Sequence, residues 1–82
     1  MTLTSFDKGG DAIKVYPQPI KTTTRVTSEA PIQRIEVYTL LGTLVLDREG
    51  EGELDFSAQP EGYYMIKVYS GKNIFVKRVE KH

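Results

Sequence analysis

The 82-residue sequence has no cysteine, no tryptophan and a single histidine, His82. Without cysteine the chain cannot form disulfides, thiol nucleophiles or cysteine zinc sites, and the shortage of histidine removes any triad that needs an internal imidazole. No apolar run approaches the roughly 20 residues of a membrane span, and residues 1–12 lack the basic start and apolar centre of a signal peptide. We therefore expect most enzyme chemistry to be excluded, and we expect no cofactor, no metal, no membrane span and no N-terminal address in the chain itself.

An excess of charge of one sign is also missing, because 11 basic and 11 acidic residues cancel to a formal net charge of zero. Such a chain has no long-range field to attract a polyanion, so we expect no nucleic acid partner. A chain of this length withdraws only roughly 60% of its unfolded surface from water, which limits it to one small domain.

Apolar and polar residues alternate along much of the chain, which is typical of half-buried strands. Ile35 and Val37 fall on one face of such a strand, with Arg34 and Glu36 on the other. Turn residues such as Gly, Pro and Asn separate the alternating stretches at short intervals. The pattern predicts strands at 12–16, 22–27, 33–39, 43–48, 53–56, 62–70 and 73–80.

Seven short strands without room for a crossover helix indicate an all-β fold, a seven-stranded antiparallel β-sandwich. Gly62 precedes Tyr64 by two residues and Ile66 follows it by two, as at a tyrosine corner whose phenol bonds back to the loop backbone. The sandwich is therefore expected to be immunoglobulin-like, without a disulfide; the alternative is that Tyr64 is a plain core aromatic. Residues 12–82 form the predicted domain, and residues 1–11 are expected to be a flexible leader or a linker to an upstream cargo domain.

Carboxylates alternate with other residues through the fourth and fifth predicted strands, at Asp47, Glu49, Glu51, Glu53 and Asp55. Counted from Asp47, Gly52 falls on the sixth position of an EF-hand loop, but Ala58 occupies the twelfth, where calcium requires a bidentate Glu. We therefore expect no calcium site, and place these carboxylates on a solvated face or along an exposed strand edge. The threonine triplet at 22–24 has no base beside it and is expected on an exposed strand face.

Charges are unevenly distributed along the chain. From Asp47 to Glu61 there are six acidic residues and only Arg48 as a base, whereas from Gly62 to His82 five bases accompany Glu80 alone. The basic end is suited to an acidic partner or to lipid headgroups. The alternative is that neighbouring strands of opposite sign pair with each other.

Four apolar or aromatic residues form a second candidate contact surface, because they fall at a hairpin tip or on outward strand faces: Leu40, Leu41, Tyr63 and Tyr69. The alternative for the hairpin tip is that one of its two leucines folds back over the open end of the sandwich.

Four segments follow one another in an order and spacing that a known family shares. They are a Tyr-Pro-Gln-Pro opening at 16–19, a strand, turn and strand at 35–45, a Leu, Pro, Gly and Tyr pattern at 54–64, and a basic and apolar last strand at 76–79. Together they resemble the C-terminal sorting domains of the type IX (Por) secretion system of Bacteroidetes, over about residues 12–81. Gln18 and Thr39 depart from the family, in which Asn and Asp are common at these turns. The motif positions fall at Tyr16, Pro17, Pro19, Gly42, Gly62 and Tyr64.

The resemblance implies a non-catalytic export signal attached to a larger precursor. Such precursors cross the periplasm, meet outer-membrane translocon and shuttle proteins of the type IX system, and reach the outer membrane, the cell surface or the medium. A sortase-like peptidase commonly removes the domain as the cargo is anchored to the surface, which would place cleavage within or before residues 1–11.

Recognition is expected to read a folded surface in which the last strand is prominent, because a terminal strand of a small sandwich can offer an unpaired edge to an added strand. The residues expected to carry this recognition are Val76, Lys77, Arg78, Val79 and Lys81. The same free edge makes a strand-exchanged homodimer a further expectation. Two other functions stay open: a carbohydrate-binding or adhesive module of a secreted hydrolase, with tyrosines as a stacking platform, and a structural spacer.

Overall fold

A computed structural model of the chain describes residues 13–82, so the expectations for residues 1–11 lie outside the described residues. The described part contains seven strands and no helix that is long and apolar enough to cross a membrane. The strand ends agree with the sequence prediction to within one residue. The strands are β1 (Ile13–Tyr16), β2 (Thr23–Ser28), β3 (Arg34–Thr39), β4 (Leu44–Glu49), β5 (Gly52–Asp55), β6 (Gly62–Ser70) and β7 (Asn73–Lys81).

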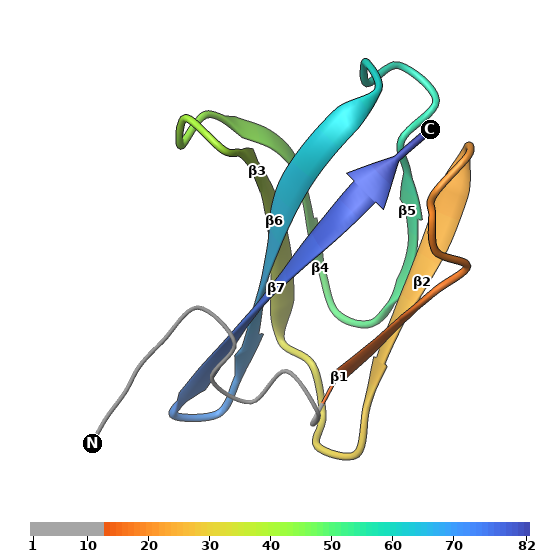
Figure 1. Ribbon diagram of the computed structural model, residues 1–82. Helices are drawn as coiled ribbons and strands as arrows, with labels where there is room; N and C mark the ends of the chain where they lie inside the picture. Colours follow the sequence, from red (N-terminus) through yellow and green to blue (C-terminus); the bar gives the residue numbers. More distant parts are fainter. Residues whose placement is uncertain (1–12) are drawn as a thin grey trace.

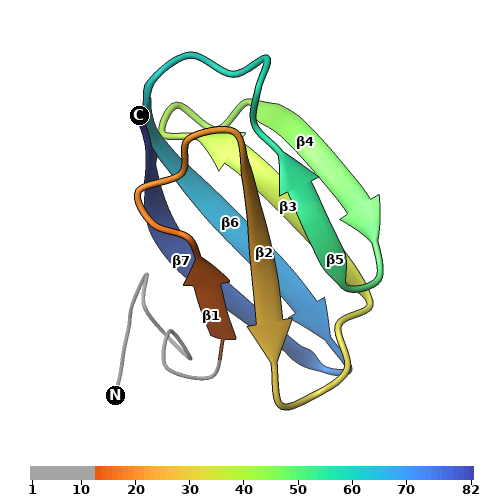
Figure 2. The same ribbon diagram turned by 90° about the vertical axis from the view of Figure 1, so that its right-hand side faces the viewer.

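The strands form two antiparallel sheets with the orders β1-β2-β5 and β4-β3-β6-β7. Figure 2 shows the three-stranded sheet in front of the four-stranded one. The arrangement is that of an immunoglobulin-like sandwich in which β4 lies beside β3 instead of beside β5. The predicted fold class is confirmed, with no cysteine available for a disulfide.

The core lies between the two sheets and follows the alternation seen in the sequence. Alternate residues of β3 and β6, such as Ile35, Val37 and Ile66, are fully buried. The intervening residues of these strands face outward and are partly exposed. The buried apolar set is Ile13, Val15, Ile20, Val26, Ile32, Ile35, Val37, Leu54, Phe56, Tyr64, Ile66, Val68 and Val79.

The corner between β5 and β6 is the predicted tyrosine corner. The hydroxyl of Tyr64 donates a hydrogen bond to the carbonyl oxygen of Pro60 at 2.5 Å. The ring is buried and packs edge-to-face on Phe56, with centroids 5.5 Å apart. Tyr64 is therefore both a core aromatic and an anchor for the loop. Two residues earlier, Gly62 has a φ of +146°, a conformation that suits glycine and lets the chain turn from the loop into β6.

Candidate recognition surface

The last strand, β7, lies at one edge of the four-stranded sheet, with β6 as its only full-length neighbour among the described residues. Figure 1 shows it crossing the front of the molecule. The five residues expected to carry recognition divide between its two faces. Val79 is buried in the core, Lys77 and Lys81 are half-buried on the same side, and Val76 and Arg78 point to the outer face of the sheet.

The loop between β1 and β2 closes over the C-terminal end of β7. The amide of Ile20 donates to the carbonyl of Glu80 at 2.8 Å, and the amide of His82 donates to the carbonyl of Ile20 at 2.7 Å. These two bonds form a parallel bridge between Ile20 and Lys81, and the Ile20 side chain is fully buried. We call this contact the Ile20 clasp.

The Tyr-Pro-Gln-Pro segment is the part of that loop that leads to the clasp. Thr24 of β2 donates its hydroxyl to the carbonyl of Pro17 at 3.2 Å, and the Gln18 amide group donates to the carbonyl of Val15 at 3.4 Å. Thr24 is buried, so the expectation that the whole threonine triplet lies on an exposed face is wrong for this residue. The opening motif and the last strand, which are far apart in sequence, therefore form one structural unit through Ile20.

The second departure from the family pattern also keeps its turn contact. Thr39 ends β3, and its hydroxyl accepts a hydrogen bond from the amide of Thr43 at 3.2 Å. The amide of Gly42 donates to the carbonyl of Thr39 at 2.9 Å, and Gly42 has a φ of +95°, a conformation that suits glycine. Threonine thus supplies at this turn the side-chain acceptor that an aspartate would supply.

Charge is separated between the two edges of the sandwich. The acidic strands β4 and β5 are the edge strands on one side, and β1 and the basic β7 are the edge strands on the other (Figure 2). Among residues 13–82, the acids of β4 and β5 make their ion pairs with Arg34 of β3, at 2.9 Å to Asp47, and with Arg25 of β2, at 3.8 Å to Glu53. The alternative that the acidic and basic strands pair as neighbours is therefore wrong for β7.

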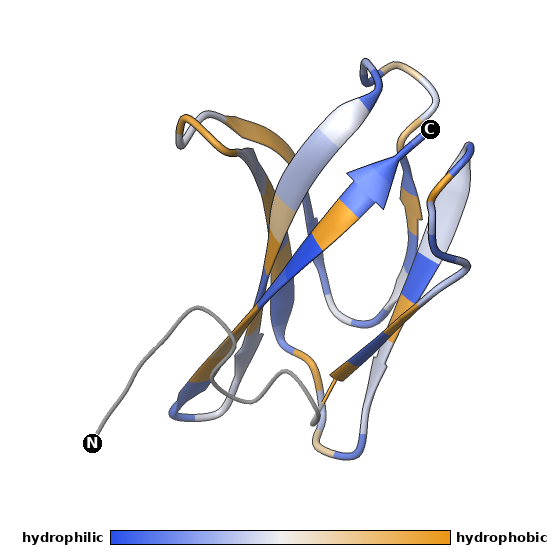
Figure 3. Cartoon of the chain, viewed as in Figure 1, coloured by the Kyte–Doolittle hydropathy of each residue, from blue (hydrophilic) through white to orange (hydrophobic). Residues whose placement is uncertain are grey.

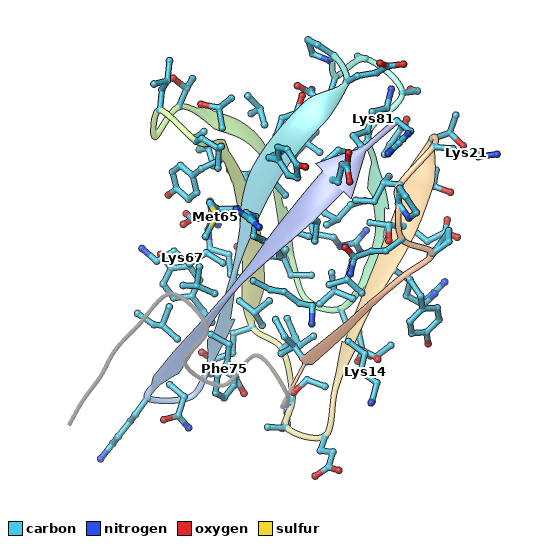
Figure 4. The ribbon with its side chains drawn as sticks, in the orientation of Figure 1. Lys14, Lys21, Met65, Lys67, Phe75 and Lys81 are labelled. Carbon is cyan, nitrogen blue, oxygen red and sulfur yellow. The ribbon has the colours of Figure 1, made fainter. Side chains whose placement is uncertain are left out.

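Five bases surround the β1–β7 edge, from β1, the clasp loop and β7. Figure 4 shows that Lys14 projects from β1, while Lys21 and Lys81 lie at the end of the molecule where the clasp forms. Glu80, the one acid of β7, lies 3.0 Å from the ring Nε2 of His82. The bases are Lys14, Lys21, Lys77, Arg78 and Lys81.

The outer face of the four-stranded sheet carries a polar and aromatic network centred on Glu36. Its carboxylate accepts hydrogen bonds from the hydroxyls of Tyr38 and Tyr69, both at 2.8 Å, and from Nε of Arg34 at 3.1 Å. The two tyrosine bonds, followed by the bond from Arg34, lower the pKa of Glu36, and the shared carboxylate raises the pKa of Tyr38. The ammonium of Lys67 lies over both tyrosine rings, 5.9 and 5.5 Å from their centroids.

The four residues of the second candidate contact surface lie at two ends of the sheet. Leu41 is 96% exposed and Leu40 57% exposed at the β3–β4 turn, which Figure 3 shows as a hydrophobic tip. Neither leucine therefore folds back over the sandwich. Tyr63 is the second residue of β6, at the same end of the sheet, whereas Tyr69 pairs with Arg34 at the opposite end of that strand.

A family model described as a secretion system C-terminal sorting domain matches residues 14–81. The chain belongs to this family. The match begins in β1 and ends with β7, so it covers both the opening motif and the clasped last strand. The comparison with curated proteins found no match, and the comparison with solved structures found none.

Membership makes the chain a C-terminal sorting domain of type IX secretion, a signal for export across the outer membrane to the cell surface or the medium. Sorting domains of this kind are generally non-catalytic. Within residues 13–82 the structure brings together no group of three or more potential metal ligands, and the carboxylate of Asp47 forms an ion pair with Arg34.

Proposed function

We propose that the type IX translocon and its shuttle proteins recognise this domain as a folded surface, through the edge of β7 and the basic residues beside it. The observation that carries the proposal is the position of β7 within residues 13–82. It is an edge strand whose outer side is paired only at the Ile20 clasp, and the acidic strands make their ion pairs with Arg34 and Arg25 and not with the bases of β7. Arg78 is exposed at the middle of this edge, over the ring of Tyr63 at 5.2 Å. An unpaired strand supplies affinity through its backbone, and the charges set the orientation of the partner.

The rest of the route follows the family. The precursor crosses the periplasm, and a sortase-like peptidase removes the domain upstream of β1 while the cargo is anchored to the cell surface. What supports a cut in residues 1–11 is the position of the core, whose first member is Ile13, almost fully buried. A cut before this residue removes none of the described core.

A reporter fusion tests the proposed function. The full 82-residue chain is attached to an inert reporter that carries its own signal peptide, in a host that has the type IX system. We expect the reporter on the surface or in the medium, and in the periplasm of a translocon mutant. A fusion that lacks Val76–His82 should likewise stay in the periplasm. Periplasmic retention of the intact fusion in the competent host would show that the domain is not a sufficient signal.

The carbohydrate-binding alternative is weakened by the tyrosines themselves. Sugar platforms need open aromatic faces, but the cation of Lys67 lies over Tyr38 and Tyr69, and the guanidinium of Arg78 lies over Tyr63. A glycan array with the purified chain separates this function from sorting, since binding to a defined glycan would support the carbohydrate-binding alternative.

The unpaired edge of β7 also supports a strand-exchanged homodimer, because two copies can complete each other's sheets. Light scattering over a range of concentrations measures this directly. A monomer whose mass does not change with concentration would argue against the dimer.

A further inference from the structure

The free backbone groups of β7 can be assigned from the register of its pairing with β6. The two strands are joined by a tight turn at Gly71 and Lys72, and Ser70 and Asn73 form the pair that closes it. In an antiparallel hairpin, alternate residues exchange both backbone bonds with the neighbouring strand. Residues 73, 75, 77, 79 and 81 therefore bond to β6, while the N–H and C=O groups of residues 74, 76 and 78 point away from the sheet.

The Ile20 clasp agrees with this assignment of inward and outward residues, and it also limits how much of the outer edge of β7 is uncovered. Glu80 belongs to the outward set, and its carbonyl is the group that accepts from Ile20. The clasp thus covers the edge from residue 80 onward, and the described chain places no strand beside residues 74–78. Five residues of strand span roughly 17 Å, enough for a short added strand and too short for a long one.

The side chains beside this free stretch are apolar at one end and basic at the other. Ile74 is 46% exposed next to the β6–β7 turn, Val76 is half-buried, and Arg78 is exposed beside the half-buried Lys77. Lys14 and Lys21 extend the positive charge along the same side of the molecule. The opposite edge carries the acidic strands, so an acidic partner is attracted to one edge and repelled from the other.

We propose that residues 74–78 of β7 accept one extended, acidic segment of a protein partner as a fifth strand of the four-stranded sheet. The inference rests on the proposed function, because it names the chemistry of the segment that reads the sorting domain. Backbone groups that alternate in donor and acceptor along a line fit a strand, and the basic flank fits carboxylates on that strand.

The probe for this edge is a blocked peptide of about five residues that alternates valine and glutamate, the length that the free stretch can hold. The isotope-labelled, full 82-residue chain is titrated with it and followed by amide chemical shifts. We expect the largest shifts at Ile74, Val76 and Arg78, and weaker binding as salt is raised. A peptide with lysine in place of glutamate should bind less tightly.

A proline substitution separates the backbone from the side chain. Val76→Pro removes an N–H that points outward and leaves the β6 ladder intact, a position where edge strands tolerate proline. We expect roughly tenfold weaker peptide binding, the loss of about one hydrogen bond. Val76→Ala keeps the N–H but removes the same side chain, so it measures the side-chain part of the loss and should weaken binding less than Val76→Pro does.

Two further measurements keep the inference testable if the proline variant does not fold. Two methylated probe peptides are compared, one with its odd-numbered and one with its even-numbered backbone nitrogens methylated. Only one of these sets faces β7 in an added strand, so only one of the two peptides should lose binding. Glu49→Pro places a proline on the opposite edge and should leave binding unchanged. Equal binding by both methylated peptides, or shifts confined to β4 and β5, would overturn the inference; the latter would instead indicate docking on the acidic edge.

The outcomes also distinguish this inference from the proposed function. If the wild-type reporter is exported but the peptide does not bind at residues 74–78, the added strand is wrong and the sorting signal stands. If the peptide binds there but the wild-type reporter stays in the periplasm, the added strand stands and the proposed function is wrong.

Discussion

Replacement of Ile20 by alanine tests whether the opening motif and the last strand act as one unit. Ile20 lies in a loop, where most side chains face solvent, yet its own side chain is fully buried against the end of β7. Truncation of a buried isoleucine to alanine costs about 2–5 kcal/mol, from lost transfer free energy and from the cavity that remains. We expect about 3 kcal/mol here, since the site lies at the rim of the core and can partly collapse.

That loss is large for a domain of this size. At roughly 0.05–0.15 kcal/mol per residue, the whole chain is stabilised by about 4–12 kcal/mol. With a urea dependence of about 1–1.5 kcal/mol per molar, Ile20→Ala should lower the unfolding midpoint by roughly 2–3 M. The amide of His82, which bonds to the carbonyl of Ile20, should also exchange faster with solvent, while the amide of Val79 keeps its protection relative to global unfolding.

The neighbouring Lys21→Ala is the matched control, because Lys21 is exposed and its loss should change stability by less than about 0.5 kcal/mol. A cost below about 1 kcal/mol for Ile20→Ala, or unchanged exchange at His82, would show that the loop merely lies against β7 and does not hold it.

Three further changes test other parts of the fold. Tyr64→Phe removes the bond to Pro60 and should cost about 1 kcal/mol, a fall in melting temperature of roughly 4–8 °C; an unchanged melting curve would contradict the role of the corner. Gly52→Ala should destabilise by about 1–2 kcal/mol, because φ is +153°, a conformation that residues with a Cβ rarely adopt, and because the Arg48 guanidinium that donates to the carbonyl of Glu53 would have to move from the new Cβ; an unchanged stability would contradict this. Glu36 has a lowered pKa in the folded state. Its contribution to the free energy of unfolding is therefore fully present above its ordinary pKa of 4.5 and is lost as the pH falls through the folded pKa. Unfolding curves of Glu36→Gln and wild type should therefore converge on acidification, and a constant difference between them across this range would contradict the network.

The strands and the tyrosine corner were predictable from sequence because they depend on local pattern. Alternation identified Ile35 and Val37 as core residues, and the Gly62 and Tyr64 spacing indicated the corner, since both signals span only a few neighbouring residues. The same local signals predicted that the two leucines sit at a hairpin tip, where the structure exposes them.

The clasp, the charge separation and the Glu36 network could not be predicted, because each depends on which strands become neighbours. Ile20 is a single apolar residue in a loop and carries no periodic signal. Glu36 meets Tyr69 only through the register of β3 with β6, across 33 residues of sequence. The acidic and basic strands occupy opposite edges only because β3 and β6 lie between β4 and β7.

Export of the reporter by the wild-type chain and by Val76→Pro, which lacks one outward N–H of β7, tests the central claim most directly. The fusion is made with the wild-type chain and with Val76→Pro, and folding of the variant is checked by its melting curve. If the edge of β7 is what the translocon reads, the wild-type fusion reaches the surface or medium, and the folded Val76→Pro fusion stays in the periplasm. Export of the folded variant at the wild-type level would contradict the account.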